Sequence, residues 1–185
     1  TKDGQMSVNN FILKPLLSFD DFKKNFPEEK QLFQFTIPQM SFSDIVLKKN
    51  KVSLSKAVFV HPQFLVYTNK VAAQKKEKKP FNFEVDVKII NFVNASAQII
   101  KPDRSHLLLA KKINFNVDNF VFNKETSQET IPVHYKDFKF SGEDILFSAN
   151  DDIHVKNILI NPKKGVFNNI SLSNVQTQSD VKVNQ

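Results

Sequence analysis

Side chains with the chemistry for catalysis or metal binding are few in this sequence and lie far apart. The chain has four histidines: His61, His106, His134 and His154. They fall on different predicted strands or turns, and none has the close local spacing of a metal-binding motif. The acidic pairs Asp20-Asp21 and Asp151-Asp152 have the character of turn or helix-cap residues. We therefore predict no catalytic residues and no metal site.

Glycine, serine and cysteine usage leads to the same expectation. Glycine occurs only at positions 4, 142 and 165, so the chain has no glycine-rich phosphate loop. No serine stands in a nucleophile-elbow motif. The absence of cysteine excludes disulfides and thiolate metal ligands, and it leaves the redox compartment open. We expect a protein with no cofactor and no enzymatic activity.

The clearest structural signal is the stretch from Phe81 to Ile89, in which apolar and polar residues alternate without a break. Successive side chains of a strand point to opposite faces, so this stretch predicts a half-buried strand. The same alternation recurs in Ile113–Val117. We expect one apolar face to include Phe81, Phe83, Val85, Val87, Ile89, Ile113, Phe115 and Val117.

Similar short runs recur along the chain every 8–14 residues, with turn signals between them. They predict an all-β fold, an elongated and curved, mostly antiparallel sheet that forms an open groove or a partly closed sandwich. One segment is ambiguous. Ser18–Phe26 has a serine cap, early acidic residues, late lysines and a following proline, which favour a short helix.

An internal echo runs through the sequence at an offset of about 100 residues. Asp44–Leu47 resembles Asp144–Phe147, and Lys56–Pro62 resembles Lys156–Pro162. Phe19–Phe22 also matches Val117–Phe120, which favours a strand for the ambiguous segment. We interpret residues 1–185 as a single all-β unit with two similar multi-strand repeats, about 17–75 and 113–175, linked by strands within 81–109.

The net charge of +7 and pI near 9.5 arise partly from one lysine-rich run. Lys75, Lys76, Lys78 and Lys79 flank Glu77 and precede Pro80. The simplest reading is a solvated loop, and the alternative is a patch that contacts an anionic surface such as lipid headgroups. Phenylalanines alternate along strands while lysines sit at turns, so we expect no nucleic-acid partner.

Both ends of the sequence are polar, and the first residue is not methionine. We expect the chain to be a segment of a longer protein. The sequence has no apolar run of about 18 residues, which a membrane-spanning helix requires.

Residues 113–160 resemble a repeat of the AsmA-like proteins of the Gram-negative envelope. The resemblance is carried by Ile131–Phe140, with its apolar-Pro, aromatic and Lys-Asp-Phe pattern, and by Val155-Lys156-Asn157-Ile158. Loosely, it extends over about residues 33–175. It implies a periplasmic or envelope-associated β-groove related to lipid-transfer proteins, attached to the membrane through parts outside this chain, and no enzymatic activity.

Two functions remain open at this stage. The first is a non-enzymatic envelope segment whose apolar sheet face binds or guides the acyl chains of phospholipid or another lipid. The second is a structural or adhesive sandwich module, in the envelope or on the cell surface, whose phenylalanines all form core. Inward phenylalanines have the same pattern in either case, and the oligomeric state is left open.

Overall fold

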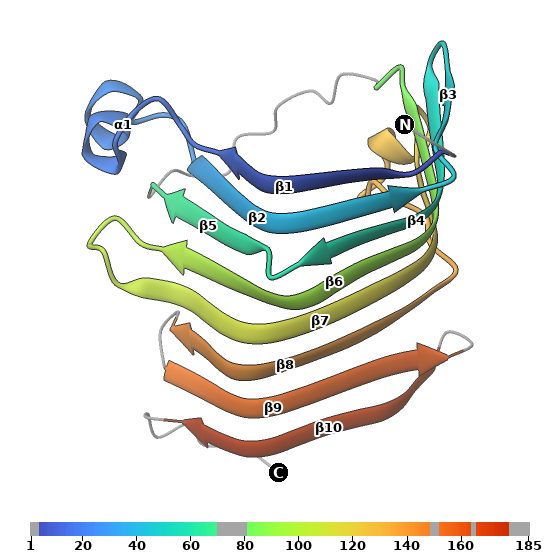
Figure 1. The fold of residues 1–185 in the computed structure, drawn as a ribbon. Helices are drawn as coiled ribbons and strands as arrows, with labels where there is room; N and C mark the ends of the chain where they lie inside the picture. Colours follow the sequence, from blue (N-terminus) through green and yellow to red (C-terminus); the bar gives the residue numbers. More distant parts are fainter. Residues whose placement is uncertain (1–3, 70–80, 149–151, 164–165, 178–185) are drawn as a thin grey trace.

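The computed structural model describes residues 4–69, 81–148, 152–163 and 166–177. The protein is all-β, as the sequence predicts, with 67% of residues in strands and 7% in helices. All ten strands belong to one sheet. They are β1 (Met6–Leu13), β2 (Gln31–Ser43), β3 (Val46–Lys48), β4 (Lys51–Val60), β5 (Gln63–Thr68), β6 (Glu84–Ile100), β7 (His106–Phe122), β8 (Asp137–Ser148), β9 (Asp152–Lys163) and β10 (Val166–Thr177) (Figure 1).

The sheet consists of two antiparallel meanders that join along one parallel pairing. The first runs from β1 to β5, where β4 and β5 lie end to end against β2. The second runs from β6 to β10. Between them, β4 and β5 both pair with β6 in parallel. The two β6 pairings have the same offset, 84 − 51 = 33 and 96 − 63 = 33, so β4 and β5 act as one long strand beside β6.

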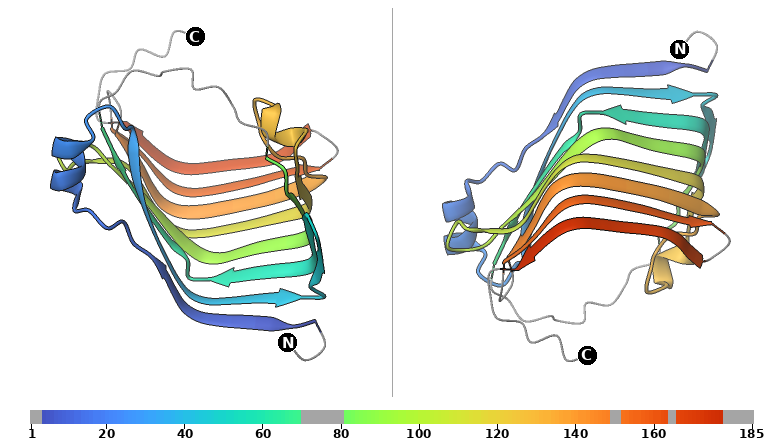
Figure 2. Two further views of the ribbon diagram at one scale, coloured as in Figure 1. Left: turned by 90° about the horizontal axis from the view of Figure 1, so that it is seen from above. Right: turned by 90° about the horizontal axis from the view of Figure 1, so that it is seen from below.

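The sheet bends twice across its strands and so forms a trough (Figure 2). In β6 the bends fall near Asn94 and Lys88. They divide the sheet into a first wall (Ala95–Ile100 in β6), a floor (Ile89–Val93) and a second wall (Glu84–Val87). We call the concave side of the trough the inner face and the convex side the outer face.

Residues with positive φ sit at several of these bends, such as Asn94 in β6 and Asn119 in β7, which lies opposite Lys88. Of the eight non-glycine residues with positive φ in the described chain, six share a local pattern in which apolar residues lie two positions before and one position after. Those six are Asn10, Asp44, His61, Asn94, Lys112 and Asn119, with φ between 49° and 55°. Asp144, with φ of 48°, precedes Ile145 in the same way but follows Gly142 by two positions. Asn, Asp and His tolerate this left-handed conformation better than most residues. A left-handed residue within a strand bends it, as in a β-bulge, and changes which side chains share a face.

The pattern makes apolar residues three positions apart share a face. Phe92 and Ala95, on either side of Asn94, line the same cavity. Phe42 and Ile45, on either side of Asp44, line another. Each strand can therefore keep its apolar side chains on the inner face around a bend.

The ambiguous segment is the helix α1 (Phe19–Asn25), so the strand suggested by the internal echo is wrong there. The hydroxyl of Ser18 accepts a hydrogen bond from the amide of Asp21 at 3.1 Å, which caps the helix. Phe19 is 6% exposed and stacks on Tyr67 with ring centroids 4.5 Å apart. Because Tyr67 follows the inner-facing Val66, α1 packs against the outer face, beyond the first wall (Figures 1 and 2).

The segments around Asp44 and Asp144, which also match in the proposed repeats, cross the sheet in opposite directions. Asp44 and Asp144 both have positive φ, but β2 and β8 run in opposite directions across the sheet. Asp44 therefore sits at the second bend and Asp144 at the first. The repeat boundaries stay a prediction.

None of the helices within the described ranges is long and apolar enough to cross a membrane.

Candidate functional site

The inner face carries continuous apolar lines from strand to strand. One line crosses the floor, with neighbours paired in register: Val8, Met40, Phe59, Phe92, Phe115, Phe140 and Ile160. A second crosses the first wall: Phe33, Val66, Ile99, Leu108, Phe147 and Ile153. On the second wall, Leu54, Val87 and Phe120 pair in the same way. None of these positions carries a polar side chain.

Ring contacts confirm that these residues share one face. Phe59 stacks on Phe92 with centroids 4.8 Å apart, and Phe92 lies 6.3 Å from Phe115. Phe64 of the first wall lies 6.0 Å from Phe92 of the floor, across the bend. The aromatic surface is therefore continuous around the first bend.

Two apolar hollows lie where the walls meet the floor. A cavity of about 360 Å³ is lined by Phe64, Phe92, Ala95, Ile113, Phe115 and Phe140. Another of about 450 Å³ lies near β1 and the second wall, and its lining includes Met6, Phe42, Leu47, Val52 and Leu54. Every residue lining the first hollow is apolar, and so are the named residues of the second. The apolar linings of both hollows suit hydrocarbon.

Much of the inner face stays exposed. Seven apolar residues near the bends are buried: Ile37, Met40, Ala57, Val87, Ala95, Ala110 and Val117. Farther out, Phe11, Phe33 and Phe147 are 39%, 45% and 42% exposed. In the described part of the chain no second sheet faces the trough, and α1 lies outside it. An uncovered apolar surface of this extent is unusual for a soluble domain, and such surfaces are candidates for binding.

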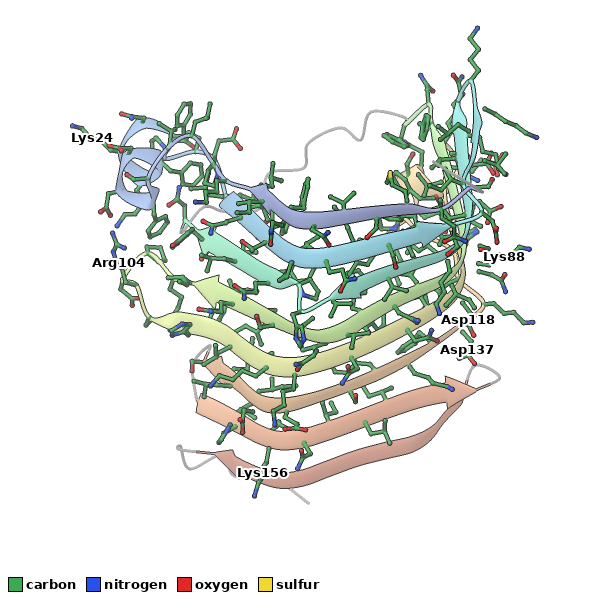
Figure 3. The ribbon with its side chains drawn as sticks, in the orientation of Figure 1. Lys24, Lys88, Arg104, Asp118, Asp137 and Lys156 are labelled. Atoms are coloured by element: carbon green, nitrogen blue, oxygen red, sulfur yellow. The ribbon has the colours of Figure 1, made fainter. Side chains whose placement is uncertain are left out.

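The outer face carries ion pairs and polar contacts among exposed apolar residues such as Ile89 and Leu159. Lys51 Nζ lies 2.6 Å from a carboxylate oxygen of Glu84, and Lys112 Nζ contacts Glu143 at 2.5 Å. The amide of Asn116 donates a hydrogen bond to Asn91 at 2.6 Å. The labelled Lys88, Asp118 and Asp137 also lie on the outer side, near the second bend (Figure 3). These charged and amide side chains therefore lie on the face opposite the apolar lines.

These contacts shift three pKa values. The hydrogen bond that Lys51 donates to Glu84 raises the pKa of Lys51, and the one that Lys112 donates to Glu143 raises the pKa of Lys112. The hydroxyl and then the amide of Ser105 donate to Asp103 and lower its pKa. All three groups lie on the outer surface or in turns. Exposed ion pairs and hydrogen bonds of this kind are common at protein surfaces and contribute little to stability.

Three of the four histidines have separate side-chain partners. His61 Nδ1 lies 3.0 Å from the amide of Asn94, and His106 Nε2 lies 3.3 Å from Gln98. His134 Nε2 lies 2.9 Å from a carboxylate oxygen of Glu129. Within the described ranges, no group of three or more potential ligands could hold a metal ion.

The structure brings most of the predicted apolar residues together on the inner face. Val85, Val87, Ile113, Phe115 and Val117 all lie there, by their pairing with the lines above. Phe81 and Phe83 precede β6 at the edge of the second wall, and Phe81 lies 4.7 Å from Phe122 between ring centroids. The lysines at 75, 76, 78 and 79 lie outside the described residues.

Ile89 is the exception. It pairs with Lys56 and Asp118, is 38% exposed and lies on the outer face. The strand changes faces at Lys88, so Ile90 rather than Ile89 continues the apolar surface. Strict alternation from Phe81 predicts that Ile89 shares a face with Val87. That prediction is wrong for Ile89, because alternation takes no account of the bend.

Sequence reasoning missed several inner residues of the floor, above all Phe92, Phe59 and Phe140. For Phe92 and Phe59, the signal that could have found them is the three-residue step between apolar residues around Asn94 and His61. For Phe140, it is the alternation with Phe138 across Lys139. No family model, curated protein or solved structure matches this chain, so the site rests on its own geometry.

Proposed function

We propose that the inner face binds the acyl chains of lipids and that the protein acts without catalysis, as a lipid-binding segment of the bacterial envelope. The observation that supports this most is the continuity of the apolar inner face over two walls and a floor. The envelope location rests on the resemblance to AsmA-like proteins and is part of the same proposal.

The dimensions of the trough suit acyl chains. Its axis runs across the strands, and β1 to β10 occupy eight positions, because β4 and β5 share one and β2 and β3 share another. Seven steps of about 4.8 Å give a length of about 34 Å. The hydrocarbon core of a bilayer, two acyl chains thick, is about 30 Å. One chain or two chains end to end therefore fit along the axis.

The energetics favour such a ligand. Each methylene removed from water contributes about 0.8 kcal/mol, so about ten methylenes supply about 8 kcal/mol before ordering costs. The sandwich alternative has less support, because the described strands all belong to one sheet and no facing sheet covers the phenylalanines.

Lipid extraction and mass spectrometry of the purified protein test the proposal, with a matched pair of variants. Phe33→Asp/Phe147→Asp charges two exposed inner positions, 45% and 42% exposed. Ile12→Asp/Leu159→Asp charges two outer positions of similar exposure, 51% and 46%. We expect the first variant to lose bound lipid and the second to retain it.

Circular dichroism shows whether both variants fold. Equal lipid content in the two folded variants, or a wild-type protein that binds no phospholipid, would contradict lipid binding on the inner face. A bound polypeptide in place of lipid would favour the structural alternative.

A further inference from the structure

A cavity of about 510 Å³ lies at the edge of the second wall, and its lining differs from the apolar hollows of the trough. Phe81 and Phe83 form its apolar part. Asn50, Asn82 and Asn123 also line it. The side-chain oxygen of Asn123 accepts hydrogen bonds from the amides of Glu125 and Thr126, at 2.9 and 3.0 Å, which leaves its NH2 group for a ligand. An apolar base with several convergent polar groups is the usual construction of a ligand site.

The apolar lining of this cavity adjoins the inner face. The Phe81 ring lies 4.7 Å from the ring of Phe122, and Phe122 pairs with Val85 on the second wall. Phe81 and Phe83 remain 40% and 37% exposed. A ligand can therefore keep one end in the cavity and lay an apolar part on the inner face.

The charges in the cavity are balanced. Glu84 is held by Lys51, whose Nζ lies 2.6 Å away. Lys124 and Glu125 also line the cavity, and neither makes an ion pair within the described residues. The cavity thus offers one cation and one anion, together with hydrogen-bonding amides.

We propose that this cavity binds a zwitterionic headgroup that combines a phosphate with a primary amine, such as phosphoethanolamine. This inference rests on the proposed function, because the acyl chains of the same lipid lie on the inner face. Lys124 attracts the phosphate, Glu125 attracts the ammonium, and the amides satisfy the remaining polar atoms. A headgroup with phosphate alone leaves Glu125 unpaired beside a like charge.

Native mass spectrometry with an equimolar mixture of dilauroyl phosphatidylethanolamine and dilauroyl phosphatidylglycerol tests this preference. The two lipids share their acyl chains, so any difference in binding arises from the headgroup. We expect the wild type to favour the ethanolamine lipid by about threefold, the range of one partly exposed ion pair. Glu125→Gln should bring the ratio close to one without lowering total bound lipid.

Three further measurements make the result specific. Glu143→Gln changes a carboxylate of the outer face and should leave the ratio unchanged. The charge swap Lys124→Glu/Glu125→Lys retains one cation and one anion and should restore part of the preference. Soluble glycerophosphoethanolamine should bind far more weakly than the lipid, because it lacks acyl chains.

The possible failures are distinguishable. A wild type that binds both lipids equally, or a preference that survives Glu125→Gln, overturns the headgroup site and leaves acyl-chain binding in place. Binding of glycerophosphoethanolamine as strong as that of the lipid overturns the lipid as ligand. Binding of neither lipid overturns the proposed function itself.

Discussion

At the scale of single residues, Ile89 and Ile90 form a natural matched pair, since they are adjacent and identical but point to opposite faces. Ile90 pairs with Ala57 and Val117 on the floor, whereas Ile89 pairs with Lys56 and Asp118. We expect Ile90→Asp to lower the free energy of unfolding by several kcal/mol and to reduce binding of a hydrophobic dye, because it places a charge among apolar groups. Ile89→Asp should change stability by less than about 0.5 kcal/mol.

Thermal melting and dye titration on the same two variants check this pair. The contrary outcome is an Ile89→Asp protein that loses as much dye binding as Ile90→Asp. That result would show that the two isoleucines contribute to one surface and that the bend at Lys88 does not separate them.

A second residue-scale prediction concerns the turn between β6 and β7. Two hydrogen bonds from Ser105 lower the pKa of Asp103, the larger effect coming from the hydroxyl at 2.6 Å. Ser105→Ala should raise the pKa of Asp103 toward its ordinary value but not fully, because the amide bond at 3.0 Å remains. A carboxyl with lowered folded pKa stabilises the fold above its unfolded pKa of about 3.9, and this stabilisation is lost as the pH falls through the folded value.

The wild type should therefore be more stable than Ser105→Ala at neutral pH, and the difference should vanish in acid below the folded pKa. Carbon-detected NMR titration of the Asp103 carboxyl measures the shift, with Ser127→Ala as a control far from this turn. An Asp103 titration curve that is identical in both proteins would refute the assignment.

At the scale of elements, the strands could be predicted from the sequence but their bends could not. Period-two alternation is visible in Ile113–Val117 and identifies a strand by itself. The bends depend on single residues such as Asn94, whose left-handed backbone interrupts the alternation for one step. By sequence propensity, such a residue predicts a turn between two short strands. In the structure β6 nevertheless stays continuous, because it pairs with β4, β5 and β7 on both sides of Asn94.

Asp144 in β8 has a positive φ of 48°. We therefore expect glycine to be more stabilising than valine at this position, the reverse of the usual order within a strand. Asp144→Gly should stabilise the protein by up to about 1 kcal/mol, because glycine adopts this conformation without steric cost. Asp144→Val should destabilise it by about 1–2 kcal/mol, because a β-branched residue is strained there. Urea denaturation measures both changes.

Ser141, an ordinary position of the same strand, provides the control and should show the reverse order. There, glycine costs about 0.5–1 kcal/mol and valine is tolerated or favourable. If both positions rank glycine and valine alike, the positive φ at Asp144 does not determine stability, and the bend has another cause.

At the scale of the whole molecule, the alternation in the sequence predicts a single curved sheet but cannot distinguish an open trough from a sandwich. An inward phenylalanine such as Phe115 has the same neighbours in sequence whether it meets protein or lipid. The choice depends on pairings between distant strands, such as the parallel contact of β4 with β6. No local pattern encodes that contact, because it joins residues 33 positions apart.

This continuity predicts that the protein unfolds as one cooperative unit. Each long strand, such as β6, runs through both walls and the floor, so no part can detach without breaking its neighbours' hydrogen bonds.

Met40→Ala lies within the first proposed repeat and Val117→Ala within the second, and both residues are buried, with 9% and 6% exposure. We expect losses of about 2–5 and about 2 kcal/mol, from lost burial and cavity formation. In urea each variant should shift one and the same transition to lower concentration without changing its slope. Two separable transitions, each moved by only one of the variants, would instead show that residues 17–75 and 113–175 fold as independent units.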